Sequence, residues 1–168
     1  MNGKTAVKQM EATRQEIGGN GFYIYPFPAF LSANLSGEIA ALLMPMVASV
    51  LPAAGGKEDF MDMDAAEAAT YLADAFSGLS GDRVENLLRK LLLSGNIGVL
   101  TEGSPDARWL TEDLCNEVFC GNTQDMFILA FHVIKVNYAG FFANFGNLSG
   151  KAAGMLRKTG FPGTAPLT

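Results

Sequence analysis

The sequence is short of charge, and what charge it has is mostly acidic. Charged residues make up 17% of the 168 residues, below the ~25% that is usual for globular domains. Lysine and arginine total 12 against 17 acidic residues, which gives a net charge of −5. Since no basic stripe interleaved with aromatic residues is present, the sequence argues against a nucleic-acid-binding protein.

Cysteine is also scarce. Cys115 and Cys120 are the only two cysteines, and their spacing in or near one helix does not suit a local disulfide. A chain without a disulfide framework fits a reducing compartment. The first 21 residues lack the apolar core of a secretory signal, so we expect the protein to remain in the cytoplasm in which it is made.

The sequence lacks the motifs of an active site or a metal site. His132 is the single histidine, and with Cys115 and Cys120 it lacks the close cysteine pair and the fourth ligand of a structural zinc site. The acidic run over 58–64 lacks the ligand pattern of an EF-hand, and no G-x-S-x-G or H-E-x-x-H motif is present. We therefore expect no enzyme, and no catalytic, cofactor-binding or metal-binding residues, cofactor or small-molecule substrate.

Long apolar runs are present, but each has a feature that disfavours a membrane span. The run over 39–51 is too short to cross ~30 Å of hydrocarbon and contains Pro45. The run over 126–145 is long enough, but Lys135 near its centre would cost about 2.5–3.5 kcal/mol in lipid. No cluster of Lys and Arg flanks it to set a topology. We expect the central helix of a bundle and no membrane partner.

Periodicity predicts a mainly helical chain. The helical pattern covers 36–51, 65–76, 82–93, 112–119 and 123–142. Asp64 and Thr111 are the expected N-terminal caps of the second and fourth helices. The segment 22–30 is rich in aromatics but holds two prolines, so it fits an edge strand or an extended arm, and 97–102 fits a short strand. The predicted fold is all-α or mainly α, a compact bundle of about five helices with a short N-terminal extended or β element.

Three parts are expected along the chain. Residues 1–21 are polar and glycine-rich and are predicted to be a flexible N-terminal arm. Residues 22–146 are predicted to form a single helical domain, and 147–168 a loose C-terminal tail with a short helix.

Apolar segments are the candidate contact elements. They are the aromatic arm at 22–30, the leucine stripe at 84–93 and the aromatic positions of 127–142. Taken singly, each fits the core better than an interface. Together they exceed what one small bundle buries easily, which favours protein binding or self-assembly. The candidate partner-binding residues are Phe22, Tyr23, Tyr25, Phe27, Leu88, Leu92, Phe127, Phe131, Tyr138, Phe141 and Phe142.

Two segments carry a family resemblance. ENLLRKLLLSGNIGV (85–99) joins a leucine-rich helix to a β-like segment, and 110–142 holds an acidic helix ending in Phe119-Cys120-Gly121 before a long helix marked by Asn137-Tyr138 and Phe141-Phe142. With the aromatic-proline arm YPFPAF before the first helix, this order resembles tailed-phage tail assembly chaperones, small helical proteins encoded next to the tape-measure protein. The basic, glycine-rich tail after residue 146 departs from that pattern.

The resemblance implies a non-catalytic role in the host cytoplasm during virion assembly. A protein of this family is expected to bind the hydrophobic, helical tape-measure protein and to keep it soluble until the tail tube assembles. Apolar grooves and adaptable methionines suit such a client. A minor structural tail or virion protein held by symmetric subunit contacts is the alternative, and homo-oligomerisation is open in both cases.

Overall fold

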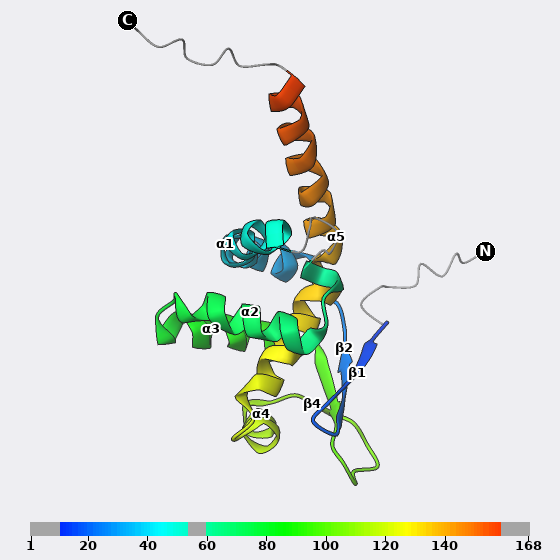
Figure 1. Cartoon of the computed structure of the whole chain (residues 1–168). Helices are drawn as coiled ribbons and strands as arrows, with labels where there is room; N and C mark the ends of the chain where they lie inside the picture. The colour runs from blue at the N-terminus through cyan, green and yellow to red at the C-terminus, as the bar shows by residue number, and fades with distance from the viewer. Residues whose placement is uncertain (1–10, 54–59, 159–168) are drawn as a thin grey trace, which may run out of the picture. The chain divides into compact units, whose positions relative to one another are not determined.

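The computed structural model describes residues 11–53 and 60–158, with side chains over 11–45 and 60–144. These residues form five α-helices, one short 3-10 helix and four strands (Figure 1). The chain divides into two compact units, one ending at Asn137 and one beginning at Tyr138. Residues 1–10 of the expected arm and 159–168 of the expected tail lie outside the described residues.

An antiparallel sheet with the strand order β1-β2-β3-β4 lies in the first unit. β1 (Thr13–Ile17) and β2 (Asn20–Ile24) form a hairpin, and its turn holds Gly18 and Gly19 at φ of 58° and 81°. A two-residue turn of this kind requires positive φ, which glycine adopts without strain. β3 (Ile97–Leu100) pairs with β2, and β4 (Arg108–Trp109) pairs with β3.

The sheet corrects the predicted fold class. The expected number of helices is confirmed, but the fold is mixed α/β rather than an all-α or mainly α bundle with one β element. Residues 13–17, expected in a flexible arm, form β1. This strand buries only Ile17, so its sequence shows no apolar alternation that would predict a strand. The remaining division into 22–146 and 147–168 stays a prediction.

The aromatic segment was also placed wrongly as an edge strand or arm. β2 lies inside the sheet between β1 and β3. The prolines that argued for an edge, Pro26 and Pro28, follow the last residue of β2. They therefore remove no donor from the β ladder.

The helices follow the predicted order with shifted ends. Their bounds are α1 Ala29–Ala53, η2 Phe60–Asp62, α2 Ala65–Ser77, α3 Gly81–Leu92, α4 Glu112–Phe119 and α5 Thr123–Lys158. α1 begins earlier than expected. α5 continues beyond residue 142, so the basic stretch at 151–158 is part of this helix and not a separate short one.

Two predicted helix caps are confirmed. The Oδ1 of Asp64 accepts hydrogen bonds from the backbone N–H of Ala66 at 3.0 Å and of Glu67 at 3.4 Å. The Oγ1 of Thr111 accepts from the N–H of Leu114 at 3.3 Å. Each cap satisfies backbone donors that the first helical turn leaves without a helical partner.

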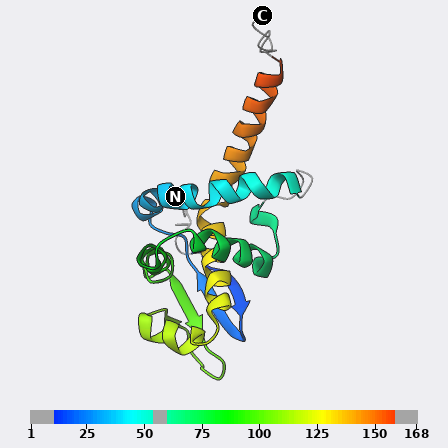
Figure 2. The ribbon, with the colours of Figure 1, turned by 60° about the vertical axis from the view of Figure 1, so that its left-hand side comes forward.

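The core of the first unit lies between the inner face of the sheet and the helices. Phe22 on β2 is fully buried and stacks on Phe119 of α4, with ring centroids 5.8 Å apart. Phe131 of α5 meets the ring of Phe60 edge-on at 5.4 Å. The fully buried Leu72 of α2 and Leu91 of α3 add to this core, and Figure 2 shows the two helices beside the first half of α5.

One stretch of α5 is long and apolar enough to cross a membrane. It covers Thr123–Asn144, with a hydropathy of 1.5. The core helix of a folded domain meets the same criteria, and Leu129, Phe131 and Ile134 of this stretch are almost completely buried. Of the most apolar window in this stretch, 39% is buried inside the protein.

Candidate partner-binding surfaces

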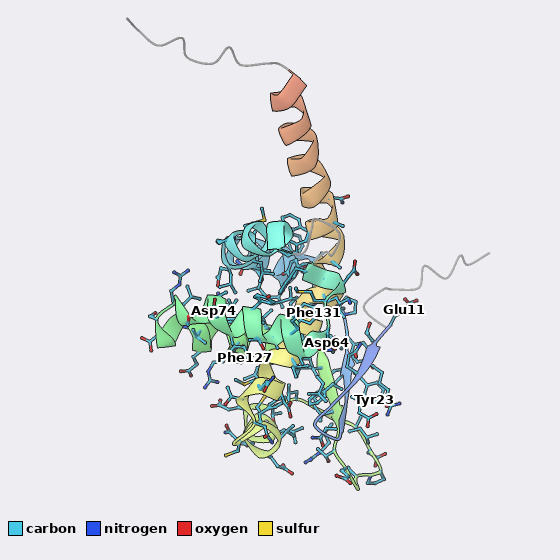
Figure 3. All side chains as sticks on the ribbon, in the orientation of Figure 1. Glu11, Tyr23, Asp64, Asp74, Phe127 and Phe131 are labelled. Carbon is cyan, nitrogen blue, oxygen red and sulfur yellow. The ribbon has the colours of Figure 1, made fainter. Side chains whose placement is uncertain are left out.

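The outer face of the sheet presents a row of side chains that crosses all its strands. Arg14 on β1 is opposite Tyr23 on β2, Tyr23 is opposite Gly98 on β3, and Gly98 is opposite Trp109 on β4. Successive residues of a strand point to opposite faces, so this row lies on the side away from Phe22. In Figure 3, Tyr23 lies on the right of the sheet, whereas Phe127 and Phe131 lie among the elements to its left.

Aromatic rings gather on this outer face. Trp109 is 58% exposed, and its ring centroid is 5.7 Å from that of Tyr25. The guanidinium carbon of Arg14 lies 5.9 Å from the ring centroid of Tyr23, within cation–π range. Gly98 places no side chain between Tyr23 and Trp109. We call Arg14, Tyr23, Tyr25 and Trp109 the aromatic face.

Asn96 holds Tyr25 in position. The backbone N–H of Tyr25 donates to the carbonyl oxygen of Asn96 at 2.8 Å, and the Nδ2 of Asn96 donates to the carbonyl oxygen of Tyr25 at 3.3 Å. Asn96 is the buried polar residue among the described residues, with 4% exposure. The pairing of β2 with β3 thus continues past the last ladder residue and fixes the backbone of Tyr25 beside Trp109. A shallow pocket of ≈ 230 Å³ lies here.

A second surface is an apolar groove between α3 and α4. α4 lies below α3 in Figure 1 and Figure 2, and the groove has a volume of ≈ 430 Å³. Its wall carries Val84, Leu88 and Leu92 from α3, Cys115 from α4 and Met126 from α5. Leu88 and Leu92 are buried, whereas the other three are half-buried. We call this surface the α3–α4 groove.

Three charged side chains stand at the rim of the α3–α4 groove. Both terminal nitrogens of Arg89 bind the carboxylate of Glu112, at 2.8 and 2.9 Å, and its Nε binds Glu85 at 2.8 Å. This fork-to-fork pairing links α3 to α4. The hydrogen bonds that Arg89 donates to Glu112 and to Glu85 raise the pKa of Arg89, and the same pairing lowers the pKa of Glu112. All three residues are exposed, so their contribution to stability is small.

Burial shifts the pKa values of two further groups, Cys115 and His132. Burial, followed by the negative charge of Glu112, raises the pKa of the Cys115 thiol to about 11. Burial and then the positive charge of Lys135 lower the pKa of His132 below its usual 6.5, against a smaller opposing effect of Asp64.

Among the residues that the structure describes, no cluster of three His, Cys, Asp or Glu side chains could hold a metal ion.

The predicted partner-binding residues are not gathered in one surface. Tyr23 and Tyr25 lie on the aromatic face, while Leu88 and Leu92 line the α3–α4 groove. Phe127 is half-buried and packs against Phe76 at 5.5 Å. Besides Leu88 and Leu92, the structure buries the side chains of Phe22, Phe27, Phe131, Tyr138 and Phe142. Phe141 is 42% exposed.

Two exposed aromatic residues are not among the partner-binding residues that the sequence predicts. Phe30, near the start of α1, is 92% exposed, and Trp109 is 58% exposed. A two-residue strand is too short to show periodicity, so β4 was not predicted. Residue type could have pointed to Trp109. It is the single tryptophan of the chain and follows an arginine, and both residue types are enriched at binding hot spots. The sequence predicts an extended aromatic segment at 22–30, whereas Phe30 lies in the first turn of α1.

The chain matches the model of a known protein family. The model of the family described as "Phage tail assembly chaperone protein, TAC" matches residues 18–150. The match includes β2 to β4, α1 to α4 and most of α5, whereas β1 precedes the matched residues. No curated protein and no solved structure matches the chain.

Proposed function

The chain belongs to the phage tail assembly chaperone family, and from this membership we propose that it binds the tape-measure protein and keeps it soluble until the tail tube assembles. The family match is the observation that carries the proposal. In this role the protein acts without catalysis, in the cytoplasm of the bacterial host, and recognises its client through an apolar surface.

We assign client binding to the aromatic face. Tryptophan, tyrosine and arginine contribute most of the binding free energy at many protein interfaces, and Trp109, Tyr25 and Arg14 lie together here. The sheet holds these side chains on paired strands, so little order has to be gained on binding. A hydrophobic client helix would lay its apolar side chains on the rings. The buried candidates, such as Phe22 and Phe131, would contribute by stabilising the fold and not by contacting the client.

Co-expression with the tape-measure protein tests the proposal. The wild-type chain should raise the soluble fraction of that protein, and the two should co-purify. Trp109→Ser with Tyr25→Ala should abolish both effects, because each substitution removes an exposed or half-exposed ring. Tyr71→Ala is the matched control, since Tyr71 is 37% exposed and lies on α2 rather than on the aromatic face. An unchanged solubility of the tape-measure protein with the wild-type chain would refute the proposal.

The protein composition of the mature particle distinguishes the chaperone from the alternative, a minor structural tail protein. A chaperone should be absent from purified mature virions, whereas a structural subunit is retained in fixed proportion to the tail proteins. Quantitative mass spectrometry of purified particles measures this ratio. Stoichiometric recovery of the chain would favour the structural role.

A further inference from the structure

Phe30 is the most exposed large apolar residue among those described. It is 92% exposed, and its neighbours Pro28 and Ala29 are exposed as well. A fully solvated phenylalanine contributes nothing to the packing of its own fold. The contiguous exposed segment Pro28-Ala29-Phe30 is therefore a candidate contact surface.

The backbone that carries Phe30 is firmly held. The preceding Phe27 is 4% exposed, and its N–H donates to the Oδ1 of Asn137 at 2.7 Å. The N–H of Ser32 donates to the carbonyl oxygen of Pro28 at 2.9 Å, which closes the first turn of α1. Phe30 is therefore presented from a preorganised helix start, which lowers the entropy lost on binding.

The start of α1 is also free of negative charge. No charged residue occurs between Glu16 and Glu38, and the first turn of α1 has no acidic side chain. A helix N-terminus carries a partial positive charge of roughly half a unit. The surface around Phe30 is thus apolar and weakly positive.

The α3–α4 groove has the complementary character. Its wall is formed by Val84, Cys115 and Met126, and its rim carries two carboxylates, Glu85 and Glu112, against the single guanidinium of Arg89. An apolar side chain at the N-terminus of a helix is complementary to this groove, because the side chain matches the apolar wall and the partial positive charge of the helix matches the carboxylates of the rim. A volume of ≈ 430 Å³ accommodates a phenyl group.

We propose that Phe30 of one copy of this chain inserts into the α3–α4 groove of a second copy. The inserted surface and the receiving surface are different, so the contact is heterologous. A pair of copies still has one unused Phe30 and one unused groove, to which further copies can add. Contacts of this type form rings or open filaments rather than closed dimers. The inference goes beyond the proposed function, because it concerns a surface other than the aromatic face.

Sedimentation velocity of the full chain at increasing concentration tests the proposal. The wild type should form species larger than a dimer. Phe30→Ser, which lacks the inserted ring, and Val84→Glu, which places a charge in the groove wall, should each be monomeric. An equimolar mixture of these two variants retains one good contact and should form a 1:1 dimer and nothing larger.

Controls separate this proposal from unfolding and from client binding. Circular dichroism should show wild-type helix content for both variants, and Leu93→Glu, at another half-buried groove position, replaces Val84→Glu if that variant unfolds. Trp109→Ser should keep self-association and lose the tape-measure protein. A wild-type chain that stays monomeric at all concentrations overturns the proposal. So does loss of association in Phe30→Ser when folded Val84→Glu still self-associates, because that pattern indicates a symmetric contact between two Phe30 residues.

Discussion

The backbone N–H of Phe27 donates a 2.7 Å hydrogen bond to the Oδ1 of Asn137, across 110 residues of sequence. The Nδ2 of Asn137 donates in turn to the carbonyl oxygen of Val133 at 2.9 Å, which fixes the orientation of the amide. One side chain of α5 therefore satisfies the backbone donor just before α1. Asn137 of the Asn137-Tyr138 pair thus connects α5 to the segment that precedes α1.

Removing this amide should destabilise the protein. In Asn137→Ala the N–H of the buried Phe27 loses its acceptor, and leaving a buried donor unsatisfied costs about 1–3 kcal/mol. Asn144→Ala, at an exposed position of the same helix, should change stability by less than about 0.5 kcal/mol. Urea unfolding of both variants measures the difference. Equal midpoints would show that the hydrogen bond contributes nothing.

Phe141 should be dispensable for folding. It is 42% exposed, whereas the adjacent Phe142 is 6% exposed. Phe141→Ala should therefore cost well below the about 3–5 kcal/mol of a buried phenylalanine, and Phe142→Ala should cost more. Thermal melts of the two variants rank them. A larger loss in Phe141→Ala would place its ring in the core and remove it as a client contact.

His132 should make stability depend on pH in the weakly acidic range. Its pKa in the folded protein lies below the usual 6.5, so below pH 6.5 the unfolded chain binds a proton that the folded chain does not. Stability from this group is complete above pH 6.5 and is lost as the pH falls towards the folded pKa. His132→Gln should remove this part of the dependence. The test compares the change in melting temperature between pH 7.5 and 5.5 in the two proteins, and an identical change would contradict the prediction.

The two cysteines should react at different rates. The pKa of Cys115 is about 11, so its thiolate is a very small fraction of the thiol at pH 8, and its half-buried position limits access. Cys120 is exposed. Labelling with iodoacetamide at pH 8 should show one fast and one slow thiol, and Cys120→Ser should remove only the fast phase. Loss of the slow phase instead would reverse the assignment.

Helix positions were predictable because they depend on local sequence. Asp64 and Thr111 were expected as caps and accept the hydrogen bonds that define caps. The leucine stripe of α3 was expected on one face, and Leu87, Leu88, Leu91 and Leu92 are buried together. β3 was expected as a short strand. In each case a residue and its neighbours three or four positions away carry the signal.

The sheet and the candidate surfaces were not predictable in the same way. β1 is mostly exposed and polar, so it shows no apolar alternation. β4 has only two residues, Arg108 and Trp109, which is too short for a periodic pattern. Whether an aromatic side chain is core or surface also depends on the partner strand. Phe22 and Tyr23 are adjacent in sequence, yet Phe22 is fully buried and Tyr23 lies on the aromatic face.

The sequence by itself determined the helical segments, the family resemblance and the absence of familiar catalytic motifs, because composition, capping and periodicity are local properties. Only the tertiary structure decided which apolar residues are available to a partner. Burial is set by contacts between segments far apart in the chain, such as β2 with β3 and Phe27 with Asn137. The same contacts that bury Phe22 and Phe131 leave Trp109 and Phe30 exposed.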